Sequence, residues 1–149
     1  MTREQRLVLT IAVLASFVSF LDGTIVNVAL PAIVRELGGG IATQQWVVDA
    51  YLITLGALIL VAGSISDLYG RIRVIRIGLI GFGLTSVAIA AAPTAELLIV
   101  ARALQGVAGA LLVPSSLALI TANFRGAAQG RAIGIWTAMT SGAMIAGPV

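Results

Sequence analysis

Long apolar segments, separated by short polar or glycine-rich breaks, run through the whole chain. About 20 apolar residues cross the hydrocarbon core of a bilayer as a helix, and these segments are of that order. Clusters of glycine, proline or charged residues interrupt the pattern at 38–40, 67–73, 93–94 and 125–131. The pattern predicts five membrane-spanning helices, over residues 7–34, 46–65, 74–92, 97–120 and 132–149. We therefore expect an all-α, polytopic membrane protein.

Composition supports the membrane assignment and narrows the chemistry. The 149 residues are 59% hydrophobic and 10% charged, whereas soluble domains carry about 25% charged residues. Cysteine and histidine are absent, so the sequence offers no disulfide, no thiol nucleophile and no imidazole ligand for a metal. We expect no metal site, no catalytic residues and no enzymatic activity, and any proton transfer must use carboxylates.

The arginines predict the orientation of the helices. The chain's net charge of +3 could indicate nucleic acid binding in a soluble domain, but here the arginines lie between apolar segments, where they act as topology signals. Seven arginines precede the first segment or follow the second and fourth: Arg3, Arg6, Arg71, Arg73, Arg76, Arg125 and Arg131. The other two breaks contain only Arg35. This alternation predicts a multi-pass protein of the plasma membrane with a cytoplasmic N-terminus and no nucleic acid partner.

Both ends of the chain need an interpretation. Residues 1–21 have the charged and apolar regions of a secretory signal peptide, but the apolar run continues beyond Asp22 and no A-x-A cleavage site closes it. We therefore interpret this region as an uncleaved first helix. The sequence stops at Gly147-Pro148-Val149, inside the fifth apolar segment, so we expect a piece of a longer protein.

One carboxylate, that of Asp22, lies well inside the first predicted helix. An ionisable side chain at bilayer depth costs about 3 kcal/mol or more, so such residues are rare and usually functional. A carboxylate at this depth can bind and release a proton as a membrane protein opens to one side or the other. Asp22 is therefore the candidate proton-coupling residue.

A second charge, Arg102, is predicted inside the fourth helix. Arg102, Gln105, Gly106 and Gly109 have the i, i+3, i+4, i+7 spacing, so they share one helix face. An arginine at this depth must face protein or water, unless its long side chain reaches the outer interface. The two glycines allow a neighbouring helix to approach closely. Residue counting leaves open whether Arg102 reaches Asp22 directly or through water.

The break between the second and third helices reads Gly63-Ser64-Ile65-Ser66-Asp67-Leu68-Tyr69-Gly70-Arg71-Ile72-Arg73. We interpret it as a short loop with glycine at its bends, because only glycine adopts positive φ at little cost. Asp67 is expected just past the second helix, where it can pair with Arg71 or Arg73. The alternative is a plain hairpin whose glycine serves only the turn.

Three weaker features complete the pattern. Small residues every fourth position predict a close-packing face on the fifth helix: Gly126, Gly130, Gly134, Ala138, Gly142 and Ala146. Asp49 is expected either at the outer interface or in a transport role, and Asn27 either contacts substrate or bonds a neighbouring helix.

Taken together, these motifs resemble the major facilitator superfamily. The break after Gly63 resembles the family's cytoplasmic loop motif, G-x-L-a-D-r-x-G-r-k, with departures at Ser66, Leu68 and Ile72. Gly147-Pro148 resembles the start of the antiporter motif G-x-x-x-G-P-x-x-G-G, with Ala143 at its first glycine position. Residues 21–31, 45–51, 102–114 and 130–136 are similar to the fourteen-helix drug:proton antiporters of the EmrB/QacA type.

The resemblance implies that residues 1–149 are the first five helices of a major facilitator domain, part of a longer transporter. It implies proton-coupled efflux of drugs or other amphipathic small molecules, with no cofactor beyond the proton gradient. Partners would be the bilayer, protons, the substrate and the missing C-terminal half. The implied roles are proton coupling for Asp22 and Arg102, a conformational latch for Gly63, Asp67, Gly70, Arg71 and Arg73, and helix packing or the antiporter motif for Gln105, Gly106, Gly109, Gly142, Gly147 and Pro148. Export of a metabolite or secondary product, and a non-transporting scaffold, are the alternatives.

Overall fold

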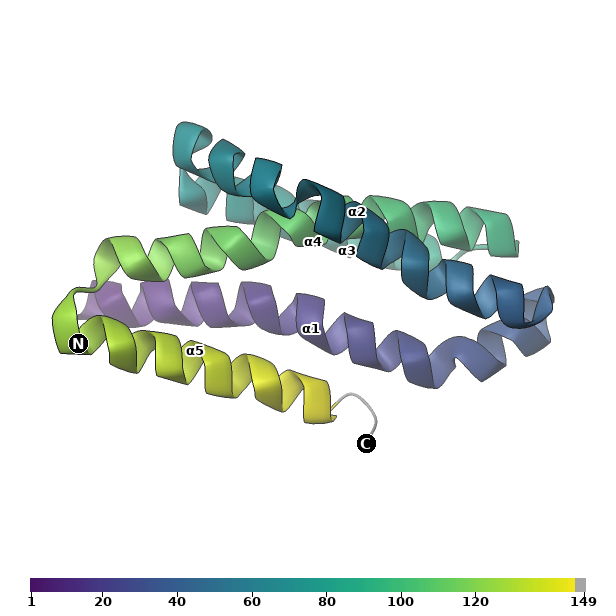
Figure 1. Ribbon diagram of the computed structural model, residues 1–149, viewed down its shortest axis with the longest axis horizontal. Coiled ribbons are helices and arrows are strands. Elements are labelled where there is room, and N and C mark those ends of the chain that lie inside the picture. The colour runs from purple at the N-terminus through teal and green to yellow at the C-terminus, as the bar shows by residue number, and fades with distance from the viewer. Residues whose placement is uncertain (147–149) are drawn as a thin grey trace.

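The computed structural model describes residues 1–146, and almost all of them lie in five α-helices. The helices are α1 (Arg3–Leu37), α2 (Gly40–Tyr69), α3 (Arg71–Ala90), α4 (Ala95–Asn123) and α5 (Gly126–Ala146). Figure 1 shows them running back and forth along one long axis. Within this described range there is no strand, so the all-α prediction is confirmed.

Local sequence explains where the helices begin and end. The side chain of Thr2 accepts a hydrogen bond from the backbone N–H of Gln5, and the side chain of Gln5 accepts one from the backbone N–H of Thr2, which forms a capping box at the start of α1. Thr94 caps α4 by accepting a hydrogen bond from the backbone N–H of Leu97. The first and fourth helices therefore begin before their apolar segments do.

Three of the four connections between helices are shorter than the sequence predicts, whereas the connection between α3 and α4 covers residues 91–94 rather than 93–94. Gly38 and Gly39, with φ of 77° and 95°, separate α1 from α2, and Gly70 alone separates α2 from α3. The predicted breaks at 67–73 and 125–131 are therefore too long. Charged residues at the end of a membrane helix weaken the apolar pattern without ending the backbone hydrogen bonding, so the helices continue into these regions.

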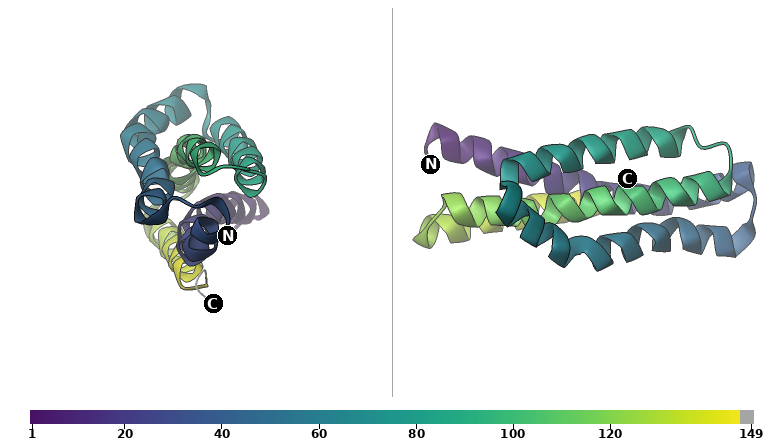
Figure 2. Two further views of the ribbon diagram at one scale, coloured as in Figure 1. Left: turned by 90° about the vertical axis from the view of Figure 1, so that its right-hand side faces the viewer. Right: turned by 90° about the horizontal axis from the view of Figure 1, so that it is seen from above.

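The central helix of the bundle is α4, which contacts each of the other four. The end-on view in Figure 2 shows the remaining helices arranged around it. In Figure 1, the N-terminus, the α2–α3 turn and the α4–α5 turn gather at one end of the bundle. The seven arginines of the predicted cytoplasmic set lie on or beside these segments, so the fold brings them to one end.

Helices α1 to α4, of 35, 30, 20 and 29 residues, are long and apolar enough to cross a membrane. Among the residues that the structure describes, α5 does not reach the same mean hydropathy, because it contains Gln129, Arg131 and several small or hydroxyl side chains. The last three residues of the predicted fifth span lie outside this range. Large apolar side chains face outward from the bundle, such as Leu60, Ile80 and Leu84, as lipid contact requires.

Candidate proton-coupling site

Asp22 of α1 and Arg102 of α4 form an ion pair inside the bundle. Arg102 Nη1 lies 2.6 Å from Asp22 Oδ2, and the two side chains are 2% and 18% exposed, respectively. The contact is direct, so no water is needed between the two groups. The side chain of Arg102 does not extend to the outer membrane interface, because its guanidinium has hydrogen-bond partners on α1 and α2 inside the bundle.

Gln105, one turn after Arg102, joins the ion pair to α3. Its Nε2 donates to Asp22 Oδ1 at 3.1 Å and to the Ser86 hydroxyl at 2.9 Å, while its Oε1 accepts from Arg102 Nη1. We refer to Asp22, Ser86, Arg102 and Gln105 as the polar cluster. Sequence analysis places Gln105 with the packing residues, whereas the structure gives its amide group three hydrogen bonds within this cluster.

Helix α2 holds the guanidinium of Arg102 from another side. Arg102 Nε donates to the carbonyl oxygen of Val47 at 3.1 Å, and its guanidinium carbon lies 4.4 Å from the centre of the Tyr51 ring. This geometry is a cation–π interaction, which strengthens when both groups are away from water. The Tyr51 hydroxyl donates to the carbonyl oxygen of Ser19 at 3.4 Å. Arg102 is therefore fixed by groups from three helices.

Glycines on α4 allow α2 to come this close. A side chain at Gly106 would overlap the Tyr51 carbonyl oxygen and the Thr54 hydroxyl, and a Cβ at Gly109 would lie 3.1 Å from the Tyr51 hydroxyl. The Thr54 hydroxyl donates across the contact to the carbonyl oxygen of Ala103 at 2.8 Å. The predicted packing face on the fourth helix is therefore present, and it places Tyr51 over Arg102.

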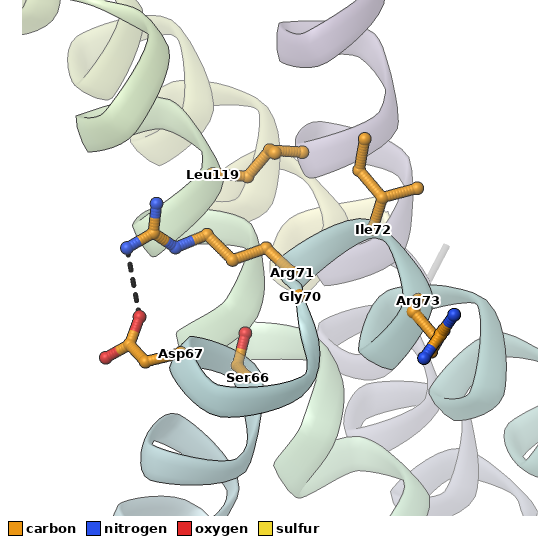
Figure 3. Close-up of a pocket in the computed structure, with 7 residues that line it drawn as sticks. All are labelled: Ser66, Asp67, Gly70, Arg71, Ile72, Arg73 and Leu119. Atoms are coloured by element: carbon orange, nitrogen blue, oxygen red, sulfur yellow. Dashed lines mark hydrogen bonds and ion pairs between the residues drawn. The ribbon is translucent and has the colours of Figure 1, made fainter.

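The α2–α3 turn contains the second carboxylate–arginine pair. Arg71 Nη2 lies 2.9 Å from Asp67 Oδ1, and the side chains are 34% and 63% exposed. Figure 3 shows this pair, with the guanidinium of Arg73 pointing away from Asp67. A shallow, open pocket of about 390 Å³ lies at this turn and is lined by Ser66, Asp67, Gly70, Arg71, Ile72, Arg73 and Leu119.

Two predictions about this turn are wrong. Asp67 lies in the last turn of α2 rather than after it, and Gly63 lies inside the same helix rather than at a bend. The bend is made by Gly70 alone, with φ 93° and ψ 126°, a conformation that is essentially restricted to glycine. The i, i+4 spacing of Asp67 and Arg71 spans this bend.

The predicted packing face of α5 points away from the rest of the described bundle. A Cβ at Gly130, Gly134 or Gly142 would meet nothing within 4 Å. Instead α5 packs through the opposite face, where the buried residues are Ala132, Thr140 and Ala143 and where Trp136 Nε1 donates to the Ser16 hydroxyl of α1 at 3.0 Å. The faces differ because Ala132 and Gly134 are two residues, or about 200°, apart around the helix. Gly147 and Pro148 lie outside the described residues.

A second cavity, of about 410 Å³, lies beside the polar cluster. It is lined by Ser19, Phe20, Gly23, Thr24, Asn27, Tyr51, Leu52, Leu55, Ile59, Val113 and Met144. Within residues 1–146, the hydrogen bond of Asn27 stays inside α1, where its Nδ2 donates to the carbonyl oxygen of Gly23 at 2.7 Å. Asp49 is exposed on α2 and does not belong to this lining.

The roles of Val47, Tyr51 and Ser86 are not apparent from the sequence. A backbone carbonyl such as that of Val47 leaves no signal in a sequence. Tyr51 lies four residues after Val47, on the same face of a mainly apolar helix, and Ser86 is one of two adjacent hydroxyl residues within the third apolar segment. Polar side chains in such positions indicate a buried hydrogen-bonding partner, but not which helix supplies it.

Comparisons with known proteins show the family to which the chain belongs. The family model of the Major Facilitator Superfamily matches residues 12–149. The puromycin resistance protein pur8 of Streptomyces alboniger is 41% identical over 140 residues, which cover 93% of this chain and 28% of the relative. The multidrug resistance protein Stp of Mycobacterium tuberculosis is 44% identical over 149 residues, covering 99% of this chain and 28% of the relative.

A third relative is described as an exporter. The tetracenomycin C resistance and export protein of Streptomyces glaucescens is 37% identical over 129 residues, which cover 87% of this chain and 24% of that protein. The chain belongs to the Major Facilitator Superfamily and is a multi-pass membrane protein. It spans about a quarter of the length of the relatives it matches.

Proposed function

We propose that this chain forms the N-terminal part of a proton-coupled transporter that exports drugs or other amphipathic small molecules. The observation that carries the proposal is the buried ion pair between Asp22 and Arg102, at 2.6 Å, inside helices long enough to cross a membrane. The resistance proteins that resemble the chain support the class of substrate. Transport in this form needs no cofactor, metal or catalytic residue, because the proton gradient supplies the energy.

The ion pair provides a way to couple a proton to a change of shape. While Asp22 is ionised, its carboxylate attracts the guanidinium of Arg102 and accepts a hydrogen bond from Gln105. A proton on Asp22 removes the negative charge, so the attraction between α1 and α4 weakens. A conformation in which these helices are less tightly joined then becomes more populated, as alternating access requires.

The same proposal assigns the orientation of the helix bundle in the membrane and the roles of the residues outside the polar cluster. The end of the bundle that carries the seven arginines faces the cytoplasm of a plasma-membrane protein, in agreement with the positive-inside rule. Asp67, Gly70, Arg71 and Arg73 then form a cytoplasmic latch against the C-terminal half of the complete transporter. Asp49 lies at the outer interface, and Asn27 lines the cavity that receives part of the substrate.

A second candidate function keeps the mechanism and changes the cargo. The chain is 37% identical to a protein named for resistance to and export of tetracenomycin C, and 36% identical to a probable actinorhodin transporter of Streptomyces coelicolor. These names favour export of the cell's own secondary product as the alternative substrate class. The side chains that face the second cavity are mostly apolar, with hydroxyl and amide groups among them, and this lining suits either cargo.

The experiment that tests the function uses the complete transporter in proteoliposomes. With Asp22→Asn, we expect uphill transport driven by an imposed pH gradient to be abolished, because the amide cannot carry the proton. Exchange of labelled for unlabelled substrate across the membrane should continue, because it requires no net movement of protons. Uphill transport at the wild-type rate in Asp22→Asn would contradict proton coupling through this residue.

Asp49→Asn is the matched control. It removes a carboxylate from the same transporter, but from an exposed position on α2 that lies outside the polar cluster. We expect gradient-driven transport to remain. Equal loss in both variants would indicate a general need for negative charge rather than a specific proton site.

A further inference from the structure

The hydroxyl of Ser86 occupies a constrained place at the edge of the polar cluster. It donates its own hydrogen to the carbonyl oxygen of Phe82, one turn earlier in α3, at 2.8 Å. Its single O–H is therefore used within α3, and only its lone pairs face the cluster. Gln105 Nε2 donates to these lone pairs at 2.9 Å. Ser86 thus acts toward Gln105 as an acceptor.

Gln105 is held in one orientation by its three polar neighbours. Both hydrogens of its amide are used, one on Asp22 and one on Ser86, and its oxygen accepts from Arg102. A rotation of the amide by 180° would place its oxygen against the carboxylate and the Ser86 lone pairs, and its NH₂ against the guanidinium. With an ionised carboxylate, these contacts are repulsive, so the present orientation is strongly preferred.

Protonation of Asp22 changes this balance. A protonated carboxyl group is itself a hydrogen-bond donor, and a rotated Gln105 amide could accept that hydrogen. Asp22 then no longer requires an N–H from Gln105, whereas Arg102 still donates to Gln105 Oε1, and Ser86, whose hydroxyl hydrogen stays on the carbonyl oxygen of Phe82, still accepts from Gln105 Nε2. Ser86 is therefore the neighbour that still requires an N–H from Gln105 after the proton has arrived.

We infer that Ser86 is a positioning residue for proton coupling: it keeps the amide of Gln105 directed as a donor toward Asp22 and so favours the ionised carboxylate. This inference rests on the proposed role of Asp22. The ionisable groups that face Asp22 in the described part of the chain are Arg102 on α4 and Tyr51 on α2. On α5 the ionisable residue is Arg131, in its second turn, at the end of the bundle.

The test compares Ser86→Ala with Thr85→Ala in the complete transporter. Thr85 is the matched control, because its hydroxyl donates only to carbonyl oxygens of its own helix, those of Gly81 and Phe82. Loss of the Ser86 acceptor leaves Arg102 alone in the polar cluster to oppose rotation of the amide, so a rotated amide that accepts from protonated Asp22 becomes more populated. We expect the pH of half-maximal efflux to rise by about 0.5 to 1 unit in Ser86→Ala, the worth of one hydrogen bond, and not to change in Thr85→Ala.

Two further variants separate positioning from a general effect on folding. Ser86→Cys keeps the shape but is a weak acceptor, so its pH profile should move in the same direction, and this variant replaces Ser86→Ala if the latter does not fold. Ser86→Thr keeps the hydroxyl acceptor, so the pH profile of efflux should be the same as in wild type. A wild-type profile in both the alanine and cysteine variants, or an equal rise in Thr85→Ala, would overturn the inference.

An infrared titration distinguishes failure of this inference from failure of the proposed function. The C=O stretch of protonated Asp22 in purified transporter is assigned by its absence in Asp22→Asn, and its appearance is followed against pH in wild type and Ser86→Ala. A higher midpoint in Ser86→Ala supports the positioning role, whether or not Asp22 proves to drive efflux. Equal midpoints would refute the positioning role and leave proton coupling by Asp22 standing.

Discussion

The described part of the chain contains two carboxylate–arginine pairs that differ in sequence separation, burial and surroundings. The pair formed by Asp67 and Arg71 spans one helix turn at the α2–α3 bend, and its side chains are 63% and 34% exposed. The pair formed by Asp22 and Arg102 joins residues 80 positions apart, and its side chains are 18% and 2% exposed. The first pair is specified by local sequence alone. The second exists only because two membrane helices pack side by side.

Surroundings decide what each pair can do. An exposed i, i+4 pair contributes about 0.3–0.5 kcal/mol, because water screens the charges and competes for their hydrogen bonds. Removal of one partner from a buried pair costs about 3–5 kcal/mol, because the other charge is left uncompensated. The buried pair is therefore sensitive to a single proton, whereas the exposed pair can form and break with little change in stability. These properties suit a proton site and a latch, respectively.

The largest expected effect comes from Arg102→Ala in the complete transporter. At neutral pH this change leaves the Asp22 carboxylate without its partner, and we expect a loss of about 3–5 kcal/mol in the free energy of unfolding. The pH profile of efflux should also move to higher pH, because removal of the positive charge makes protonation of Asp22 more favourable. Thermal denaturation of the purified protein and efflux assays across pH measure the two effects.

Arg71→Ala is the comparison for this variant, because it removes an arginine from the exposed pair. Its unfolding free energy should change by less than about 0.5 kcal/mol. A similar loss of stability in the two arginine variants would remove the distinction between the pairs. A less stable Arg102→Ala with an unshifted pH profile would reduce Arg102 to a structural residue.

Gly106→Ala tests the helix contact that holds the buried pair. The added methyl group would collide with the backbone oxygen of Tyr51 and with Thr54, which cannot both move without separating α2 from α4. We expect a loss of about 1–3 kcal/mol in unfolding free energy, with reduced gradient-driven transport, because Tyr51 and Val47 would shift from Arg102. Gly83→Ala is the control: its Cβ would meet nothing within 4 Å in the described chain. Equal stability of the two variants would show that the close contact is unimportant.

Gly70→Val tests the bend beside the exposed pair. Among residues 1–146, no atom beyond the two chain neighbours of Gly70 lies within 4 Å of a Cβ built there, so the effect must come from the backbone, whose φ of 93° would strain valine by about 1–3 kcal/mol. We expect slower transport with substrate affinity less affected, as a latch rather than a binding site requires. Transport kinetics and substrate binding by the purified variant measure the two. Wild-type transport would leave Gly70 with a role in the turn alone.

The sequence predicted the fold because length, hydropathy and glycine position are local properties. It also placed Asp22 and Arg102 inside helices, since a charge within a long apolar run has few explanations. It could not give the partners of Arg102, because the carbonyl of Val47 and the ring of Tyr51 reach it through the packing of α2 against α4. The error about Gly63 and Asp67 arose because charged residues at a helix end resemble a loop. The small residues at every fourth position of α5 define one helix face, but periodicity does not show which neighbouring helix packs against that face.

The most direct test of the account is proton release from the purified complete transporter when substrate is added. Weakly buffered wild-type protein should release protons on binding, because substrate favours the conformation in which Asp22 is ionised. The same should hold for Asp67→Asn, whose changed carboxylate belongs to the exposed pair, while Asp22→Asn should release none. Normal proton release by Asp22→Asn, or its loss in Asp67→Asn alone, would contradict the assignment of proton coupling to the buried pair.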